Sequence, residues 1–195
     1  YYYSLWNGDY PYNQVTAIDG TISAGGGMEY PNVTVIGESG SAFSLDVVIA
    51  HEVGHNWFYG ILGSNERTNA WMDEGINTFV QYIAEQDFGE KYPDAIAPNK
   101  KYPSRRGPAK NIVGYMSGDQ NSIAPIMTKG LNTYNFGANG YSKPGTGLNI
   151  LRETVMGREL FDYSFKTYAQ RWMFKHPSPE DFFRTMEDAS AMDLD

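Results

Sequence analysis

The sequence contains no cysteine, has fewer basic than acidic residues, and lacks a long hydrophobic run. Without cysteine, the chain can form neither disulfide bonds nor thiolate metal sites, although this absence does not identify the compartment. Lysine and arginine total 15 against 23 aspartate and glutamate residues, so the net charge is -8. This charge argues against nucleic acid and anionic membranes as partners. No segment approaches the ~18 apolar residues of a membrane-spanning helix, and no signal-peptide pattern is present.

The length and composition suit a folded domain. The 195 residues, 41% of them hydrophobic, are enough for one large domain with a hydrophobic core. The chain begins with tyrosine instead of methionine and stops without a clear terminator, so we expect it to be a piece of a longer protein. The acidic, cysteine-free composition is compatible with a periplasmic, secreted or envelope-associated protein.

The first forty residues carry strand and turn signals. The segments 15–18 and 21–22 flank Asp19-Gly20, a dipeptide typical of hairpins, and so predict a β-hairpin. Glycines 25–27 then interrupt the chain before a β-rich segment at 33–36. Consecutive glycines allow the backbone to approach another group closely, although from the glycines alone a mobile turn is the favoured explanation.

Two helices are predicted in the next fifty residues. The first covers 44–59 and can end at Gly60 or Gly63. The second covers about 72–88, with Gly89 as its stop. Their apolar stripes are Leu45, Val48, Ile49 and Val53 in the first helix, and Ile76, Phe79, Val80, Ile83 and Phe88 in the second.

The periodicity fades from residue 91 to 144 and returns after that. We interpret 91–144 as a long loop region, in which Lys100, Lys101, Arg105, Arg106 and Lys110 form a basic cluster. A solvated loop explains this cluster better than an acidic partner does. Apolar stripes predict helices near 148–157, 161–172 and after Ser178, which is a helix-capping residue followed by proline.

The strongest chemical signal is the segment His51-Glu52-Val53-Gly54-His55. Two histidines four residues apart on a helix lie on one face, so both rings can reach one metal ion. His-Glu-x-x-His on a helix is typical of zinc hydrolases, with the glutamate as general base toward water. Eighteen residues separate His55 from Glu74, which opens the second predicted helix and completes a His-His-Glu ligand set for one zinc ion.

A chance match is the alternative to this interpretation. Short patterns of this kind occur at random, but a glutamate on its own predicted helix strengthens the signal. His51 and His55 are also two of only three histidines in the chain. The third, His176, precedes Pro177 in a predicted turn, and we expect it to be structural or exposed.

Several motifs together resemble the gluzincin aminopeptidases, of aminopeptidase N and leukotriene hydrolase type. Besides the segments 51–57 and 71–75, Gly26-Gly27-Met28-Glu29-Tyr30 is similar to the family's Gly-x-Met-Glu-Asn motif, with tyrosine at the last position. Tyr141-Ser142-Lys143-Pro144-Gly145 is similar to its Tyr-x-Lys-Gly segment, with proline inserted. The resemblance extends from about residue 26 to 160, in the family's order.

The resemblance implies a fold: α+β, mainly α, a thermolysin-like zinc peptidase catalytic domain with a small N-terminal sheet and a helical C-terminal part. The family's flanking domains have no counterpart here. We therefore expect one catalytic domain over 1–195, with this division: a β-rich cleft edge (about 1–40), zinc-binding helices (41–90), the long loop region (91–144) and helices (145–195).

The resemblance also implies roles for individual residues. Gly26, Gly27 and Met28 would lie on a strand along the cleft and bind substrate there. Glu29 would bind the free α-amine of a peptide substrate, because a carboxylate at the end of a cleft selects an ammonium group. Tyr141 would donate a hydrogen bond to the developing oxyanion. Asp73 and Asn56 are candidates for orienting the metal ligands.

Three other functions stay open on the sequence. A thermolysin-like endopeptidase would share the zinc chemistry but have no amine-binding group. A hydrolase acting on a non-peptide such as an epoxide would use the same metal site, although no residue specifically supports it. A non-catalytic scaffold is the third alternative, and the intact ligands and Glu52 argue against it.

Overall fold

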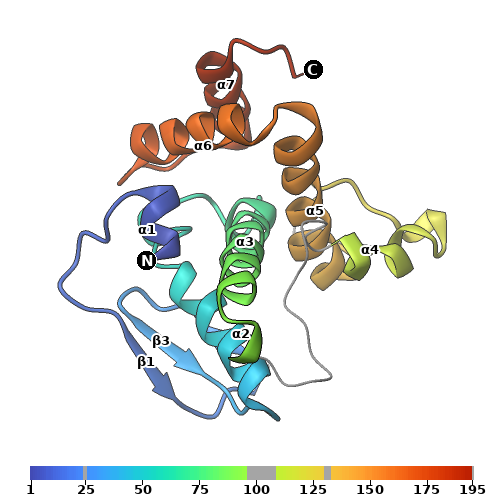
Figure 1. Ribbon diagram of the computed structural model, residues 1–195. Helices are drawn as coiled ribbons and strands as arrows, with labels where there is room; N and C mark the ends of the chain where they lie inside the picture. Colours follow the sequence, from blue (N-terminus) through green and yellow to red (C-terminus); the bar gives the residue numbers. More distant parts are fainter. Residues whose placement is uncertain (24–25, 96–108, 130–132, 195) are drawn as a thin grey trace.

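Two central helices organise the computed structural model, which describes residues 1–23, 26–95, 109–129 and 133–194. They are α2 (Ala42–Gly54) and α3 (Ile76–Lys91), and they lie side by side (Figure 1). A three-stranded sheet packs on α2, and the C-terminal helices lie toward the other end of α3. The expected mainly helical α+β architecture with a small sheet is confirmed.

The sheet differs from the predicted hairpin. It contains β1 (Thr16–Asp19), β2 (Gly27–Met28) and β3 (Val33–Ile36), in the order β1-β3-β2. β1 pairs with β3 in parallel, whereas β2 pairs with β3 in antiparallel. After β1, the backbone N–H of Gly20 donates to the Ile36 carbonyl at 2.9 Å, so the chain continues along β3 instead of turning back. The hairpin prediction at Asp19-Gly20 is therefore wrong.

A short helix precedes the sheet, where only strand and turn were expected. α1 (Tyr2–Asn7) has six residues and no side-chain cap, so its intrinsic stability is low. Burial holds it: Tyr3 and Trp6 are each 7% exposed, and the Tyr3 ring stacks on Trp57 with centroids 5.4 Å apart. The stabilising contacts are long-range, which explains why local sequence signals missed this helix.

α2 begins as predicted but ends earlier. Ser41 and Ser44 form a reciprocal capping box at its start. The helix stops at Gly54, five residues before the predicted end. Its apolar stripe is only partly buried: Leu45 is 40% exposed, whereas Val53 packs against the core. The residues that α2 buries are Glu52 and Gly54, both in its last turn.

α3 and the region after it contain more helix than expected. A π-helical turn, η1 (Trp71–Gly75), runs directly into α3, and α3 continues through Gly89 to Lys91. Within its described residues, the predicted long loop at 91–144 contains four further helical segments: η2 (Pro93–Ala95), α4 (Ala109–Met116), η3 (Gln120–Ser122) and the π-helical turn η5 (Gly137–Ser142). This expectation is corrected accordingly.

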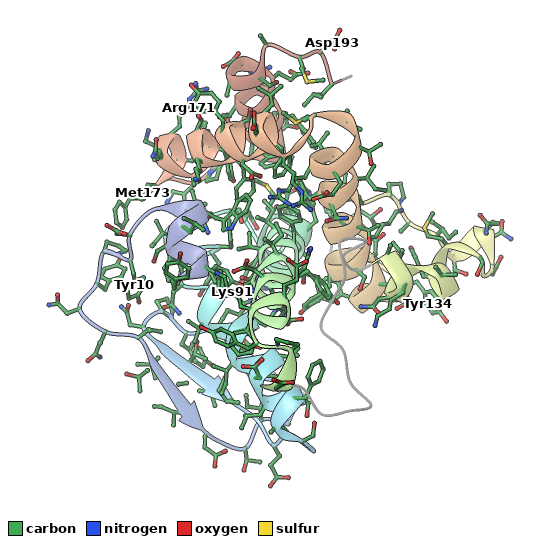
Figure 2. The ribbon with its side chains drawn as sticks, in the orientation of Figure 1. Tyr10, Lys91, Tyr134, Arg171, Met173 and Asp193 are labelled. Carbon is green, nitrogen blue, oxygen red and sulfur yellow. The ribbon has the colours of Figure 1, made fainter. Side chains whose placement is uncertain are left out.

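The predicted basic cluster is described at one position. Lys110 is exposed at the start of α4, and the other four residues, Lys100, Lys101, Arg105 and Arg106, lie outside the described residues. Figure 2 shows Tyr134 on the same side of the molecule as α4, and its side chain is 75% exposed. This side of the molecule therefore contributes little to the core.

The C-terminal part is helical, as predicted. α5 (Lys143–Ile150) passes through a π-helical turn, η6 (Leu151–Val155), and is followed by α6 (Arg158–Trp172) and α7 (Pro179–Ser190). Ser178 caps α7 through a capping box with Asp181. Buried side chains from these helices and α3 form the main core, and the fully buried ones include Phe79, Phe161, Phe165, Phe182 and Met186.

Two further expectations can be compared with the structure. His176 is exposed, and its Nδ1 lies 2.9 Å from the Gly63 carbonyl, which supports a structural role. Within the described ranges, no helix has the length and apolar character needed to cross a bilayer.

Arg152 connects the first helix with the C-terminal helices. Its guanidinium donates to both carboxylate oxygens of Asp162, at 2.7 and 3.0 Å, and lies 4.8 Å from the centroid of the Trp6 ring. Arg152 is 7% exposed, so this bidentate pair is largely shielded from solvent. An exposed pair, Arg171 with Asp188 at 3.1 Å, offers a comparison on the surface.

We predict that Arg152→Met lowers the free energy of unfolding by about 2–4 kcal/mol, because Asp162 loses its partner and Trp6 loses a packing contact. Arg171→Met should change it by less than ~1 kcal/mol, since exposed ion pairs contribute little. Urea denaturation of both variants measures the difference. Equal losses in the two variants would contradict a special role for Arg152.

Candidate active site

Three ligand atoms converge where α2 meets η1. The Nε2 atoms of His51 and His55 lie 3.1 Å apart, and Oε2 of Glu74 lies 3.1 Å from the first and 3.2 Å from the second. Ligands bound about 2.0–2.1 Å from a tetrahedral zinc ion lie roughly 3.3 Å from one another. The triangle formed by His51, His55 and Glu74 therefore fits a zinc ion without rearrangement.

The outer ring nitrogen of each histidine also has a partner. Nδ1 of His51 lies 2.8 Å from Oε1 of Gln81, and Nδ1 of His55 lies 2.7 Å from Oδ1 of Asp73. An acceptor on Nδ1 keeps the proton there and leaves the Nε2 lone pair directed at the ligand centre. Burial, together with the charges of Glu74 and Glu29, raises the pKa of Asp73 against the opposing effect of His55.

The end of α2 is held by side chains from two other elements. The Glu52 carbonyl accepts a hydrogen bond from Oγ1 of Thr34 on β3 at 3.0 Å, and the His51 carbonyl accepts one from Nδ2 of Asn77 on α3 at 2.8 Å. The Tyr3 hydroxyl in turn donates to Oδ1 of Asn77 at 3.0 Å. A Cβ at Gly54 would lie 2.2 Å from both the Tyr3 hydroxyl and Asn77 Oδ1, so only glycine allows this packing.

Glu52 sits in a confined position beneath β2. Its side chain is 7% exposed, and Oε2 is buried without a hydrogen-bond partner among the described residues. A Cβ at Gly27 would lie 2.3–2.6 Å from the Glu52 side chain, so β2 can cross the carboxylate only because residue 27 is glycine. Burial raises the pKa of Glu52 to about 7, because His51 and His55 only partly offset the desolvation.

Glu74 and Tyr141 both lie in π-helical turns, and these turns contact each other. A π-helical turn contains an extra residue, which changes the direction of a side chain relative to a regular helix. The ring of Pro144, next to η5, packs on Gly75 of η1. A Cβ at Gly75 would lie 2.4 and 2.7 Å from ring carbons of Pro144, so glycine allows the close approach. Pro144, an interruption of the sequence motif, is thus a packing residue.

Tyr141 lies against the ligand centre. Its ring stacks on His51 with centroids 5.7 Å apart and an interplanar angle of 24°. Burial and the neighbouring Glu74 carboxylate raise the pKa of the phenol, so the hydroxyl keeps its proton. Lys143, two residues on, donates to the Ala124 carbonyl and connects η5 to the segment after α4. Lys143 therefore supports the turn that contains Tyr141.

Glu29 follows β2 on the His55 side of the centre. One carboxylate oxygen of Glu29, a ring nitrogen of His55 and a carboxylate oxygen of Asp73 lie within 4.8 Å of one another. Glu52 and Glu74 add further negative charge close by. This concentration of carboxylates favours cationic ligands, such as a metal ion or an ammonium group.

A cleft of about 400 Å³ joins most of the predicted site residues. Its walls include Gly26 and Gly27 from the sheet side, His51 and Glu52 from α2, and Tyr141 from η5. The remaining predicted residues surround it: His55 and Glu74 complete the ligand triangle, Glu29 lies near His55, and Met28 is half-buried in β2. All nine predicted site residues therefore gather in one region, although Gly25 of the glycine segment lies outside the described residues.

Several contributing residues were not predicted from the sequence. On α3, buried polar side chains recur at helical spacing after Glu74, namely Asn77, Gln81 and Glu85. A polar stripe on an otherwise apolar helix is the signal that could have identified them. Thr34 had no such signal, because its contact with Glu52 connects distant segments.

Asn56 does not contact the metal ligands, in contrast to the sequence-based suggestion. Its Oδ1 accepts from the Asn32 backbone N–H at 2.8 Å and from the Tyr10 hydroxyl at 3.2 Å. Its amide donates to the Val53 carbonyl at 2.9 Å. Asn56 therefore ties the end of α2 to the segment before β3.

The fold and this arrangement of two histidines and a downstream glutamate define the class of gluzincin-type metallopeptidases. The chain belongs to peptidase family M1, since the model of the peptidase family M1 domain matches residues 1–195. The resemblance inferred from the motifs is confirmed by this match. The family and the solved structures similar to the chain indicate zinc as the cofactor.

Curated relatives of the chain are named aminopeptidases. Aminopeptidase B of Rattus norvegicus is 28% identical over 167 residues, which cover 80% of this chain and 24% of that protein. Glutamyl aminopeptidase of Bos taurus is 26% identical over 150 residues, which cover 73% of this chain and 14% of that protein. The chain therefore matches less than a quarter of the length of either relative.

Solved structures support the fold. The M1 zinc metallopeptidase of Deinococcus radiodurans superposes with a TM-score of 0.71 at 18% identity, over 97% of this chain and 39% of that chain. An E323A mutant of the enzyme bound to a Tyr-Ser-Ala substrate gives a TM-score of 0.71 at 17% identity, over 98% of this chain. At these identities the similarity concerns the fold alone.

We predict that Gly75→Ala lowers the free energy of unfolding by about 1–3 kcal/mol and weakens zinc binding, because the new methyl group separates η1 from η5. Gly147→Ala in α5 is the matched control, since a Cβ there would meet no atom within 4 Å. That change should be neutral or stabilising by up to ~1 kcal/mol. Thermal unfolding with and without zinc tests both variants, and unchanged zinc binding in Gly75→Ala would contradict the proposed packing.

Proposed function

We propose that residues 1–195 belong to a zinc aminopeptidase and fold as its thermolysin-like catalytic domain. The observation that carries this proposal is the triangle of His51, His55 and Glu74 beside the buried, unpartnered carboxylate of Glu52. The aminopeptidase names of the similar proteins support the same function. Because these relatives are several times longer, we further propose that the chain works within a longer multidomain protein.

His51, His55 and Glu74 are the proposed ligands of one zinc ion. Bound there, zinc supplies Lewis-acid chemistry by polarising a water molecule and the scissile carbonyl. Gln81 accepts from Nδ1 of His51 and keeps that imidazole oriented. Nδ1 of His55 faces the Phe58 carbonyl at 3.2 Å, and the Asp73 carboxylate lies beside the same nitrogen.

Glu52 is the proposed general base and acid. Its Oε2 has no competing hydrogen-bond partner among the described residues, so it can take a proton from the attacking water. The same carboxyl then transfers the proton to the leaving amine. The low exposure of Glu52 keeps its pKa close to neutrality, where a residue can act in both steps.

Tyr141 is the proposed hydrogen-bond donor to the oxyanion that forms on the scissile carbonyl. Its raised pKa keeps the phenol protonated, and its stacking on His51 fixes the ring next to the ligand centre. The contact between Pro144 and Gly75 then holds the two π-helical turns in one arrangement.

β2 and Glu29 are the proposed determinants of exopeptidase action. β2 lies at one end of the strand order, and Gly26, Gly27 and Met28 offer a strand along which a peptide can lie in extended form. Glu29 ends this strand with a carboxylate that can pair with a free α-ammonium group. A peptide bound with its N-terminus at Glu29 would lose one residue at each turnover.

We predict that Glu52→Gln retains zinc but lowers kcat by about 10²–10⁴-fold, because the amide cannot accept the proton from water. Metal analysis and turnover of a free aminoacyl substrate measure the two effects. Glu159→Gln, at an exposed carboxylate on α6, is the control and should leave both unchanged. Full activity in Glu52→Gln would refute the assigned role. In the wild-type protein, a chelator should abolish activity and added zinc should restore it.

A second prediction separates the aminopeptidase from its alternatives. The wild-type protein should cleave substrates with a free α-amine, and Glu29→Gln should lower kcat/KM for them by about 10–100-fold, because a charge-assisted hydrogen bond is lost. N-acylated versions of the same substrates should be cleaved poorly by both proteins.

Each other outcome of this comparison identifies a different function. Preferential cleavage of N-acylated substrates would indicate an endopeptidase. Absence of bound zinc together with absence of turnover would indicate a scaffold. Hydrolysis restricted to a non-peptide substrate would indicate the third alternative.

A further inference from the structure

A hydrogen-bonded chain leads from His51 through two buried side chains of α3. Nδ1 of His51 lies 2.8 Å from Oε1 of Gln81, and Nε2 of Gln81 donates to Oε1 of Glu85 at 2.6 Å. Gln81 and Glu85 are each 5% exposed, one helical turn apart on the face of α3 that packs against α2. Gln81 therefore connects a proposed metal ligand to a buried carboxylate that does not touch the metal site.

The surroundings of Gln81 determine which way its amide points. Its Nε2 faces two acceptors, the Glu85 carboxylate and the Val47 carbonyl at 3.4 Å. If the amide were flipped, its oxygen would face these acceptors, and its NH₂ group would face His51. The observed orientation therefore presents an acceptor to His51, which retains its proton on Nδ1 and leaves Nε2 unprotonated.

We propose that Gln81 and Glu85 form a positioning relay for His51: Glu85 orients the Gln81 amide, and the amide oxygen sets the tautomer and the direction of the imidazole. This inference rests on the proposed function, since it assumes that His51 is a zinc ligand. It concerns the affinity and geometry of the site and not a catalytic step.

The buried position of Glu85 argues that the relay is more than packing. A carboxylate removed from water loses favourable hydration, and an apolar side chain would avoid this cost in a helix whose other buried residues include Phe79, Val80 and Ala84. The neutral amide of Gln81 next to His51 also avoids adding a further negative charge to the carboxylates around the proposed metal site. Glu85 lies one residue further away, where its Oε1 accepts from Nε2 of Gln81. Burial raises the pKa of Glu85 to about 7, so this hydrogen bond is charge-assisted where the carboxyl is ionised.

The same helix contains a matched pair with no link to the site. Gln86 donates from Nε2 to Oε1 of Glu90 at 3.1 Å, with the same residue types and the same spacing. This pair lies in a solvent-exposed environment. Gln86→Leu and Glu90→Gln therefore reproduce the chemical changes of Gln81→Leu and Glu85→Gln without reaching His51.

The test is the zinc affinity of the full chain, measured by competition with a chelating dye, with folding monitored by circular dichroism. Gln81→Leu should weaken zinc binding by about 10–100-fold, as expected when a metal-bound histidine loses its outer partner. Glu85→Gln should weaken it by about fivefold, the difference between a charged and a neutral acceptor. The two control substitutions should leave zinc affinity unchanged.

A double swap keeps the proposal testable if Gln81→Leu fails to fold. In Gln81→Glu combined with Glu85→Gln, a carboxylate accepts directly from His51 and is held by the new amide. This variant should bind zinc at least as tightly as wild type. Nitrogen-15 NMR of the zinc-loaded protein should show a protected Nδ1–H on His51 in wild type and in the double swap, and a less protected one in Glu85→Gln.

The outcomes separate this inference from the proposed function. If His51→Ala weakens zinc binding but Gln81→Leu and Glu85→Gln, both folded, bind zinc as tightly as wild type, the relay is refuted and the metal site stands. If His51→Ala has no effect on zinc affinity, the proposed metal site itself fails. Equal weakening in the Gln86 and Glu90 controls would attribute the effect to general destabilisation of α3 and overturn the relay.

Discussion

The two hydrogen bonds that close the last turn of α2 are the constraint on which the site depends. A helix end leaves carbonyl groups without intrahelical partners, and buried ones require partners from elsewhere. Here the carbonyl of His51 accepts a hydrogen bond from Asn77, and the carbonyl of Glu52 accepts one from Thr34. The proposed metal ligand His51 and the proposed general base Glu52 are therefore each anchored through their own backbone. One anchor comes from α3 and the other from the sheet. The metal site can therefore form only when these three elements have assembled.

The assembled site concentrates negative charge. Four carboxyl groups lie around the two imidazoles, those of Glu29, Glu52, Asp73 and Glu74. Burial raises the pKa of Glu52 and Asp73, so ionising these two groups costs free energy. Such an arrangement opposes folding unless a cation offsets the repulsion. Ligands that bind only the folded state stabilise it. The clustered carboxylates therefore both lower the stability of the metal-free protein and attract zinc. The neutral amide of Gln81 behind His51 limits this cost.

The convergence of His51 and His55, two of the proposed zinc ligands, could be predicted from the sequence because their spacing is local. The spacing of His51 and His55 follows from the helical repeat, and the capping signal at Ser178 marks a real helix start. Where tertiary contacts decide the structure, prediction failed. The parallel pairing of β1 with β3 replaces the expected hairpin. α2 ends at Gly54, where the distant side chains of Thr34 and Asn77 donate hydrogen bonds to carbonyls of its last turn. α1 likewise depends on long-range burial of aromatic rings.

The two π-helical turns show a further limit of motif reading. In the sequence, Pro144 interrupts the family's Tyr-x-Lys-Gly motif, and Gly75 has no assigned role beyond following the proposed ligand Glu74. In three dimensions the proline ring packs on that glycine, and the pair keeps η1 against η5. A regular helix in either place would rotate Glu74 or Tyr141 by the equivalent of one residue, because a π-helical turn contains one residue more. The insertion is thus consistent with Tyr141 as the family's tyrosine, since it supplies the contact that keeps the phenol beside His51.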